Sequence, residues 1–187
     1  MTTLTLDDDG HWLNEARRVA SPNCDNRPAD TDINLIVMHG ISLPPRQYGG
    51  PYIDQLFTNT LNPTEHPYFA EIVALRVSSH LLIDRRGHLT QYVPFHDRAW
   101  HAGQSNYRGR QNCNDFSIGI ELEGCDDQNY EKCQYEIAAT VVKLLMQHFP
   151  AIGKQDVVGH CDIAPGRKTD PGEAFDWKGF RALLDQA

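Results

Sequence analysis

The apolar run NLIVM at residues 34–38 constrains the fold of this chain more than any other stretch of its sequence. The run is short, rich in branched side chains and followed by His39 and Gly40, a pattern typical of a strand buried on both faces. A chain of 187 residues is long enough for one domain with a substantial core, and short for two. We therefore expect a single domain, residues 1–187, with this strand inside a central sheet.

The other patterns in the sequence predict strands and helices that do not alternate strictly. Strands are predicted from apolar or alternating runs at residues 78–84 and 88–93, which form a hairpin, and at 117–123 and 157–158. Helices are predicted at residues 52–58, at 131–149 up to Pro150, and from the N-cap Asp176 to Leu184. The alternation in SIGIELE, residues 117–123, predicts a half-buried strand with one polar face. With residues 1–30 largely irregular, the order predicts an α+β domain with a mixed central β-sheet flanked by helices.

The charge of the chain limits its partners. A formal net charge of -8 argues against nucleic acid and anionic membranes, because binding to either usually requires a basic face. No apolar run approaches the roughly 20 residues of a membrane-spanning helix. The N-terminal segment MTTLTLDDDGHW also lacks the basic-then-apolar pattern of a signal peptide. We expect a cytoplasmic monomer that acts on a small molecule.

The segment GHCDIAPGRKTDPG, residues 159–172, has the composition of a functional loop. It carries His160, Lys168 and Asp170 between proline and glycine residues, directly after the predicted strand at 157–158. His39 follows another predicted strand, so the two imidazoles emerge at the same edge if those strands are neighbours. Two neutral imidazoles and a carboxylate are the ligand set of a catalytic zinc ion, which keeps a fourth position open for water. Zinc lowers the pKa of such a water to about 7 and polarises carbonyl groups.

Each of these ligands has a structural alternative. His39 is also placed to cap its strand, and Asp170 before Pro171 and Gly172 is also placed to form a turn. Four other histidines lie on or near the predicted hairpin, and no spacing rule excludes them: His80, His88, His96 and His101.

Two further residues have the chemistry of an acid–base pair. Glu121 lies between apolar residues of its strand, where partial burial raises the pKa of a carboxyl group toward the range of a general base. Lys168 is suited to stabilise a developing oxyanion. The structural alternatives are a solvated or ion-paired glutamate and a surface lysine.

The segment RAWHAGQSNYRGR, residues 98–110, combines aromatic and basic residues. Trp100 can stack on a sugar ring, and Arg108 and Arg110 can form paired hydrogen bonds with a carboxylate. The alternative is a solvated loop that Trp100 anchors to the core.

Seven segments recur in the same order in the AmpD-type N-acetylmuramoyl-L-alanine amidases, and the chain resembles that family from about Ala16 to Leu184. They are INLIVMHGISLPP, HPYFAEIVALRVSSHLLIDRRG, QYVPF, RAWHAGQSNYRGR, CNDFSIGIELEG, GHCDIAPGRKTDPG and FDW. Motifs this long and in this order are more specific than any single one. The wider superfamily includes phage T7-type amidases and animal peptidoglycan recognition proteins.

The resemblance implies a zinc amidase fold, with one Zn²⁺ held by His39, His160 and Asp170. It implies hydrolysis of the amide between the lactyl group of (1,6-anhydro-)N-acetylmuramic acid and L-alanine, in cytoplasmic peptidoglycan recycling. In bacteria with an inducible β-lactamase, such enzymes also lower the level of the inducing muropeptide. We expect Glu121 to take the proton from the attacking water and to protonate the leaving nitrogen, while Lys168 stabilises the oxyanion.

The resemblance also implies contacts to the 1,6-anhydro-muramyl peptide. They are Trp100 against the sugar, Arg76 and Arg110 near the peptide carboxylates, and Tyr68 along the groove. Gly40 and Asn112 depart from the family pattern, which has Asn and Arg at these positions, and this affects the expected preference for the stem peptide.

Two other functional classes are open from the residues alone. A non-catalytic muropeptide-binding module would lack part of the ligand set or of the acid–base pair, and this chain has both. A cysteine hydrolase would use Cys161 beside His160, but neighbours along an extended segment point to opposite faces. The five scattered cysteines form no C-x-x-C pair and are expected to be reduced.

Overall fold

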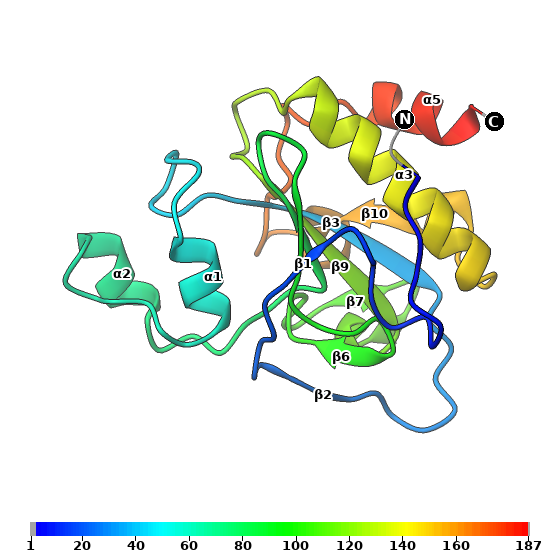
Figure 1. Cartoon of the computed structure of the whole chain (residues 1–187), viewed down its shortest axis with the longest axis horizontal. Helices are drawn as coiled ribbons and strands as arrows, with labels where there is room; N and C mark the ends of the chain where they lie inside the picture. The colour runs from blue at the N-terminus through cyan, green and yellow to red at the C-terminus, as the bar shows by residue number, and fades with distance from the viewer. Residues whose placement is uncertain (1–2, 187) are drawn as a thin grey trace.

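A six-stranded sheet forms the centre of the computed structural model, which describes residues 3–186 (Figure 1). Its strand order is β1-β5-β4-β9-β3-β10. The strands span Arg17–Arg18 (β1), Leu89–Gln91 (β5), Leu81–Ile83 (β4), Ser117–Glu123 (β9), Leu35–Ile41 (β3) and Val157–Gly159 (β10). β4, β9, β3 and β10 run parallel, whereas β4 and β5 form the antiparallel hairpin. The sheet is therefore mixed, as the sequence predicts.

Helices cover the sheet and extend from one end of it. They are α1 (Tyr52–Phe57), α2 (Pro67–Ile72), α3 (Lys132–His148), α4 (His160–Ile163) and α5 (Trp177–Asp185). Figure 1 shows α3 and α5 side by side against the sheet, while α1 and α2 project to the left of the view. Two 3₁₀ turns, η1 (Cys113–Asp115) and η2 (Lys154–Asp156), precede β9 and β10. No helix in residues 3–186 has both the length and the apolar character needed to cross a membrane.

Two short pairs of strands complete the fold outside the central sheet. β2 (Cys24–Asn26) pairs with β6 (Asp97–Ala99), and β7 (Asn106–Tyr107) pairs with β8 (Arg110–Gln111), both antiparallel. β1 pairs with β5. The N-terminal segment thus contains two short strands in addition to its irregular parts.

Strand β3 explains the continuous apolar run of the sequence. Ile36 and Met38 pack on one face of the sheet in the core under α3 and α5, and Leu35 and Val37 pack on the other face against Phe116 and its neighbours. Because the sheet is covered on both faces here, the strand has no solvated side that would favour alternation.

The structure corrects three expectations about the strands near the site. β9 lies between β4 and β3, and both of its faces are covered, so it is buried along its whole length. The prediction of a half-buried strand at residues 117–123 was therefore wrong. β3 continues through Ile41, so His39 lies within the strand instead of after it. His160 begins the short helix α4, so this part of the expected loop is helical.

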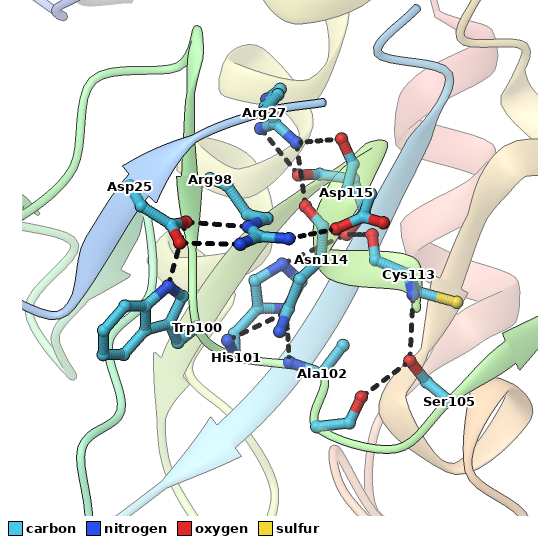
Figure 2. Close-up of polar contacts among 12 residues, drawn as sticks. Asp25, Arg27, Arg98, Trp100, His101, Ala102, Ser105, Cys113, Asn114 and Asp115 are labelled. Carbon is cyan, nitrogen blue, oxygen red and sulfur yellow. Dashed lines mark hydrogen bonds and ion pairs between the residues drawn. The ribbon is translucent and has the colours of Figure 1, made fainter. Parts of the chain in front are cut away.

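Arg27 ties the N-terminal segment to the start of β9. Its guanidinium donates hydrogen bonds to the carbonyl oxygens of Asn114 and Asp115 in η1 (Figure 2). It also donates to the carbonyl oxygens of Phe95 and Ser117, and all four bonds are 2.9–3.1 Å long. Burial lowers the pKa of Arg27 to about 10, which leaves it charged at neutral pH. One side chain therefore satisfies four carbonyl groups around η1.

We expect Arg27→Met to lower the free energy of unfolding by about 3 kcal/mol or more, because several carbonyl groups lose their charged donor together. Urea denaturation followed by circular dichroism measures this loss. The control is Arg18→Met, at an exposed arginine that lies 3.7 Å from Asp7, where we expect a change below about 0.5 kcal/mol. Equal effects of the two changes would contradict the role given to Arg27.

Candidate active site

Parallel pairing brings His39 and His160 together. In the register of β3 and β10, Met38 pairs with Gly159. The residues that follow them, His39 and His160, are therefore neighbours. The two Nδ1 atoms lie 3.0 Å apart, and each lies 3.1 Å from Oδ2 of Asp170. Both imidazoles are almost completely buried, and the carboxylate is 15% exposed. Within residues 3–186 this is the one group of three or more possible ligands whose atoms converge in this way.

The donor atoms fit a metal ion. The backbone carbonyl of Ala102 lies 3.2 Å from Nε2 of His160. A carbonyl only accepts, so Nε2 carries the proton and Nδ1 of neutral His160 presents its lone pair to the cluster. Burial lowers the pKa of His39 to about 4, so this ring is neutral at pH 7. Converging lone pairs and a carboxylate repel one another unless a cation lies between them, and two imidazoles with one carboxylate suit catalytic zinc.

The carboxylate of Asp170 is held in its charged form. Burial opposes its ionisation, but the neighbouring imidazoles of His160 and His39 outweigh burial and keep the pKa of Asp170 well below its usual value. Asp170 therefore offers a charged oxygen to a cation at this position.

Glu121 lies beside the cluster on the neighbouring strand. It pairs with His39 in the register of β3 and β9, and its side chain is 8% exposed. Its buried Oε2 has no hydrogen-bond partner among the described residues. Burial, reinforced by the charge of Asp170, raises the pKa of Glu121 well above its usual value, although Lys168 opposes the shift. A carboxyl group in this state can exchange a proton near neutral pH.

One cleft of about 650 Å³ contains the cluster, Glu121 and Lys168. The remaining lining comes from His101 and from three segments that are distant in sequence: 40–46, the region 56–78 around α2, and 124–127. Tyr68 and the exposed Lys168 side chain lie in this lining, as the resemblance implies. Arg46 and Asp127 also line it and form an ion pair between two of the segments. No local pattern predicts that pair, because the two residues are 81 positions apart in the sequence.

Three expected substrate contacts lie outside the residues that line this cleft. Trp100 lines a separate, smaller pocket of about 420 Å³ and donates its indole N–H to Asp25 (Figure 2). Arg76 donates to backbone carbonyls of its own segment. The guanidinium of Arg110 lies 3.9 Å from the ring centre of Phe116. The structure therefore does not bring these three side chains together with the metal cluster.

The competing histidines have other surroundings. His88 is exposed and pairs with Asp84 at 2.9 Å, His96 packs against His11, and His80 is buried beside Arg27. His101 lines the same cleft and contacts His39, with its Nδ1 2.9 Å from Nε2 of His39. None of the four contributes an atom to the converging group.

Gly40 packs directly against Tyr130. A Cβ atom at this position would lie 2.3 Å from the hydroxyl of Tyr130, which donates a 2.8 Å hydrogen bond to the carbonyl of Pro171. Tyr130 therefore occupies the space next to Asp170 that a larger residue at position 40 would need. Asn112 has a positive φ of 58° ahead of η1.

The structure disfavours Cys161 as a nucleophile. Cys161 lies in the first turn of α4, so the expected extended geometry was wrong. Burial raises the pKa of its thiol, with Asp162 and Asp170 adding to the shift, so the thiolate that a nucleophile requires is disfavoured.

Comparison with known proteins identifies the family of the chain. Residues 29–173 match the family described as N-acetylmuramoyl-L-alanine amidase. A 1,6-anhydro-N-acetylmuramyl-L-alanine amidase AmpD from Salmonella typhimurium (strain SL1344) is 60% identical over 94% of both chains. The AmpD of Escherichia coli (strain K12) is 58% identical over 94% of this chain and 95% of its own length.

Solved structures show the same fold. The crystal structure of a Se-Met AmpD derivative superposes with a TM-score of 0.93 at 58% identity, covering 96% of this chain and 99% of that one. AmiD from E. coli, in complex with anhydro-N-acetylmuramic acid-L-Ala-D-gamma-Glu-L-Lys, gives a TM-score of 0.59 at 26% identity over 99% of this chain and 67% of that chain. The expected amidase fold is confirmed, and the chain belongs to the N-acetylmuramoyl-L-alanine amidase family.

Proposed function

We propose that this protein hydrolyses the amide between the lactyl group of 1,6-anhydro-N-acetylmuramic acid and L-alanine in muropeptides, as a zinc enzyme of cytoplasmic peptidoglycan recycling. The observation that carries the proposal is the convergence of His39, His160 and Asp170 beside the unpartnered carboxyl of Glu121 in one cleft. AmpD relatives near 60% identity support the substrate class. Because both the ligand set and the acid–base residues are present, a non-catalytic binding module is disfavoured.

One zinc ion per chain is the proposed cofactor. His39 and His160 would hold it through Nδ1 and Asp170 through Oδ2. When bound, zinc supplies a Lewis acid that polarises the substrate carbonyl and makes an attacking water more acidic.

Glu121 is the proposed general base and acid. Its raised pKa suits proton transfer near pH 7, and its position on β9 next to His39 fixes it beside the metal ligands. The carboxylate takes the proton of the attacking water and then delivers it to the alanine nitrogen as the amide bond breaks. Lys168 reaches the same cleft and stabilises the negative charge that develops on the carbonyl oxygen.

The muropeptide is proposed to extend from the cleft along Tyr68 and toward Trp100, Arg76 and Arg110. The complex of AmpDh3 from Pseudomonas aeruginosa with anhydromuramic pentapeptide, at 27% identity, supports a peptide-bearing sugar as the ligand class. Since the two arginines lie outside the cleft lining, they contact only the distal part of the stem peptide. The protein is proposed to act as a monomer, without a nucleic-acid or membrane partner. Its activity would lower the level of inducing muropeptide in a host with an inducible β-lactamase.

Metal removal tests the cofactor. We expect chelation to reduce amidase activity to background and added zinc to restore it, with one zinc per chain by mass spectrometry. Asp170→Asn should weaken zinc binding by about tenfold or more, because it removes the anionic ligand. In the control Asp162→Asn the side chain still accepts from the Gly159 amide, so zinc content should be unchanged. Activity that survives complete chelation but is lost on thiol alkylation would point to cysteine chemistry instead.

Replacement of Glu121 separates catalysis from metal binding. We expect Glu121→Gln to lower kcat on an anhydro-muramyl tripeptide by about 10²–10⁴-fold while zinc content stays at one per chain. Glu123→Gln is the matched control on the same strand. Its carboxylate accepts from the Gly49 and Arg85 backbone amides outside the cleft, so stability should fall and turnover should persist. Loss of zinc from Glu121→Gln would show that this residue is a ligand or a structural group.

The distal contacts are tested by Arg76→Ala and Arg110→Ala. We expect each change to raise KM for the tripeptide substrate by about fivefold with little effect on kcat, because a carboxylate contact remote from the scissile bond contributes uniform binding. Substrate that carries L-alanine alone, measured in parallel, should show no change in KM. An unaltered KM in both variants would remove the two arginines from the substrate site.

A further inference from the structure

Two consecutive residues, His101 and Ala102, contact both histidines of the metal cluster. Nδ1 of His101 lies 2.9 Å from Nε2 of His39, and the carbonyl oxygen of Ala102 lies 3.2 Å from Nε2 of His160. Both residues are buried. The segment between β6 and β7 thus contacts both proposed histidine ligands at Nε2, the ring nitrogen that does not face the cluster.

A directed chain of hydrogen bonds sets the protonation of His39. Ser117 Oγ lies 2.5 Å from the carbonyl oxygen of Cys113. The hydroxyl must donate to this carbonyl, so its oxygen accepts the Nε2–H of His101 at 3.1 Å. Nδ1 of His101 is then unprotonated and accepts from Nε2 of His39. His39 therefore presents a bare Nδ1 to His160 and Asp170, as a metal ligand requires.

Asn114 anchors this arrangement from η1. Its Oδ1 accepts hydrogen bonds from the backbone amides of His101 at 3.1 Å and Ala102 at 2.8 Å (Figure 2). The turn that carries Asn114 is itself fixed, because Arg27 binds two of its carbonyl groups. On the sheet side, a Cβ at Gly119 would lie 2.6 Å from the His101 ring, so the ring fills that space completely.

We propose that Asn114 and Ser117 are positioning residues of the metal centre, which act through His101 and Ala102 to fix the tautomer and orientation of both histidine ligands. The proposal rests on the zinc dependence proposed above. Partners that orient ligating histidines typically change metal affinity by about 10- to 100-fold when they are removed. Neither Asn114 nor Ser117 lines the cleft, so their effect on zinc is indirect.

The test compares Asn114→Leu, which has a similar size and no acceptor, with Asn114→Asp, which retains an acceptor for the two amides. Zinc dissociation constants are measured on the folded, zinc-free proteins by competition with a chromogenic chelator, and the visible spectrum of the cobalt-substituted proteins reports ligand geometry. We expect Asn114→Leu to raise the dissociation constant about 10- to 100-fold and to change the cobalt spectrum. Asn114→Asp should stay within about threefold of the unmodified protein with its spectrum retained.

Asp7→Leu is the matched control. Asp7 Oδ1 also accepts from two consecutive backbone amides, those of His11 at 2.8 Å and Trp12 at 3.0 Å, outside the cleft lining. We expect it to lower the stability of the zinc-free protein and to leave the zinc dissociation constant and the cobalt spectrum unchanged. An equal loss of zinc affinity in Asp7→Leu and Asn114→Leu would show general destabilisation and would overturn the proposal.

Other outcomes are also decisive. A folded Asn114→Leu protein with unchanged zinc affinity and cobalt spectrum would overturn the positioning role. If Asn114→Leu does not fold, Ser117→Ala replaces it in the test, because this change removes the oxygen that accepts from Nε2 of His101. Unchanged zinc affinity in Ser117→Ala would likewise overturn the positioning role. Absence of zinc binding by the unmodified protein would instead overturn the metal assignment itself.

Discussion

The parallel pairing of β3 with both β9 and β10 is the constraint on which the active site depends. It places His39 of β3 next to Glu121 of β9, and it places His160 directly beyond the end of β10 beside His39. The backbone hydrogen bonds of the sheet thus fix three side chains that are far apart in the sequence. Asp170 completes the group from the loop that follows α4. Ligands that project from a rigid sheet need little rearrangement to bind a metal, which favours affinity.

The same sheet explains why the charged groups of the site differ from ordinary surface residues. Both faces of β3 and β9 are covered, so His39 and Glu121 are removed from water. Burial raises the pKa of Glu121 and lowers that of His39, which keeps the first able to carry a proton and the second free to coordinate. A buried carboxyl oxygen without a partner costs stability in any protein. A loss of stability from an unpartnered buried group is characteristic of a functional site when the group lies beside a cluster of possible ligands.

The sequence predicted much of this arrangement because the signals are local. The apolar run at residues 34–38, the alternating run at 117–123 and the polar loop after 157–158 each indicate an element and its end. Their assembly was a hypothesis, because neither the strand order nor the position of His101 can be read from spacing. The error on β9 has a physical reason: Glu121 faces the cleft and Glu123 binds two backbone amides, so neither acidic residue is on a solvated face. Alternation of polarity therefore predicted the strand but not its burial.

What the sequence could not indicate is the set of contacts behind the ligands. Asn114 lies close to His101 along the chain, but its function depends on the carbonyl of Ala102 reaching His160, 58 residues away. The role of Gly40 could not be predicted from the sequence for the same reason. Its small size matters because the hydroxyl of Tyr130, which donates to the carbonyl of Pro171, lies directly against it. The ligands occupy positions that strand patterns and family motifs identify, whereas their supports are backbone groups and small residues without a chemical signature. The affinity of a metal site depends on both, so a complete ligand motif establishes the chemistry of the centre, and the surrounding hydrogen bonds determine how tightly it binds the ion.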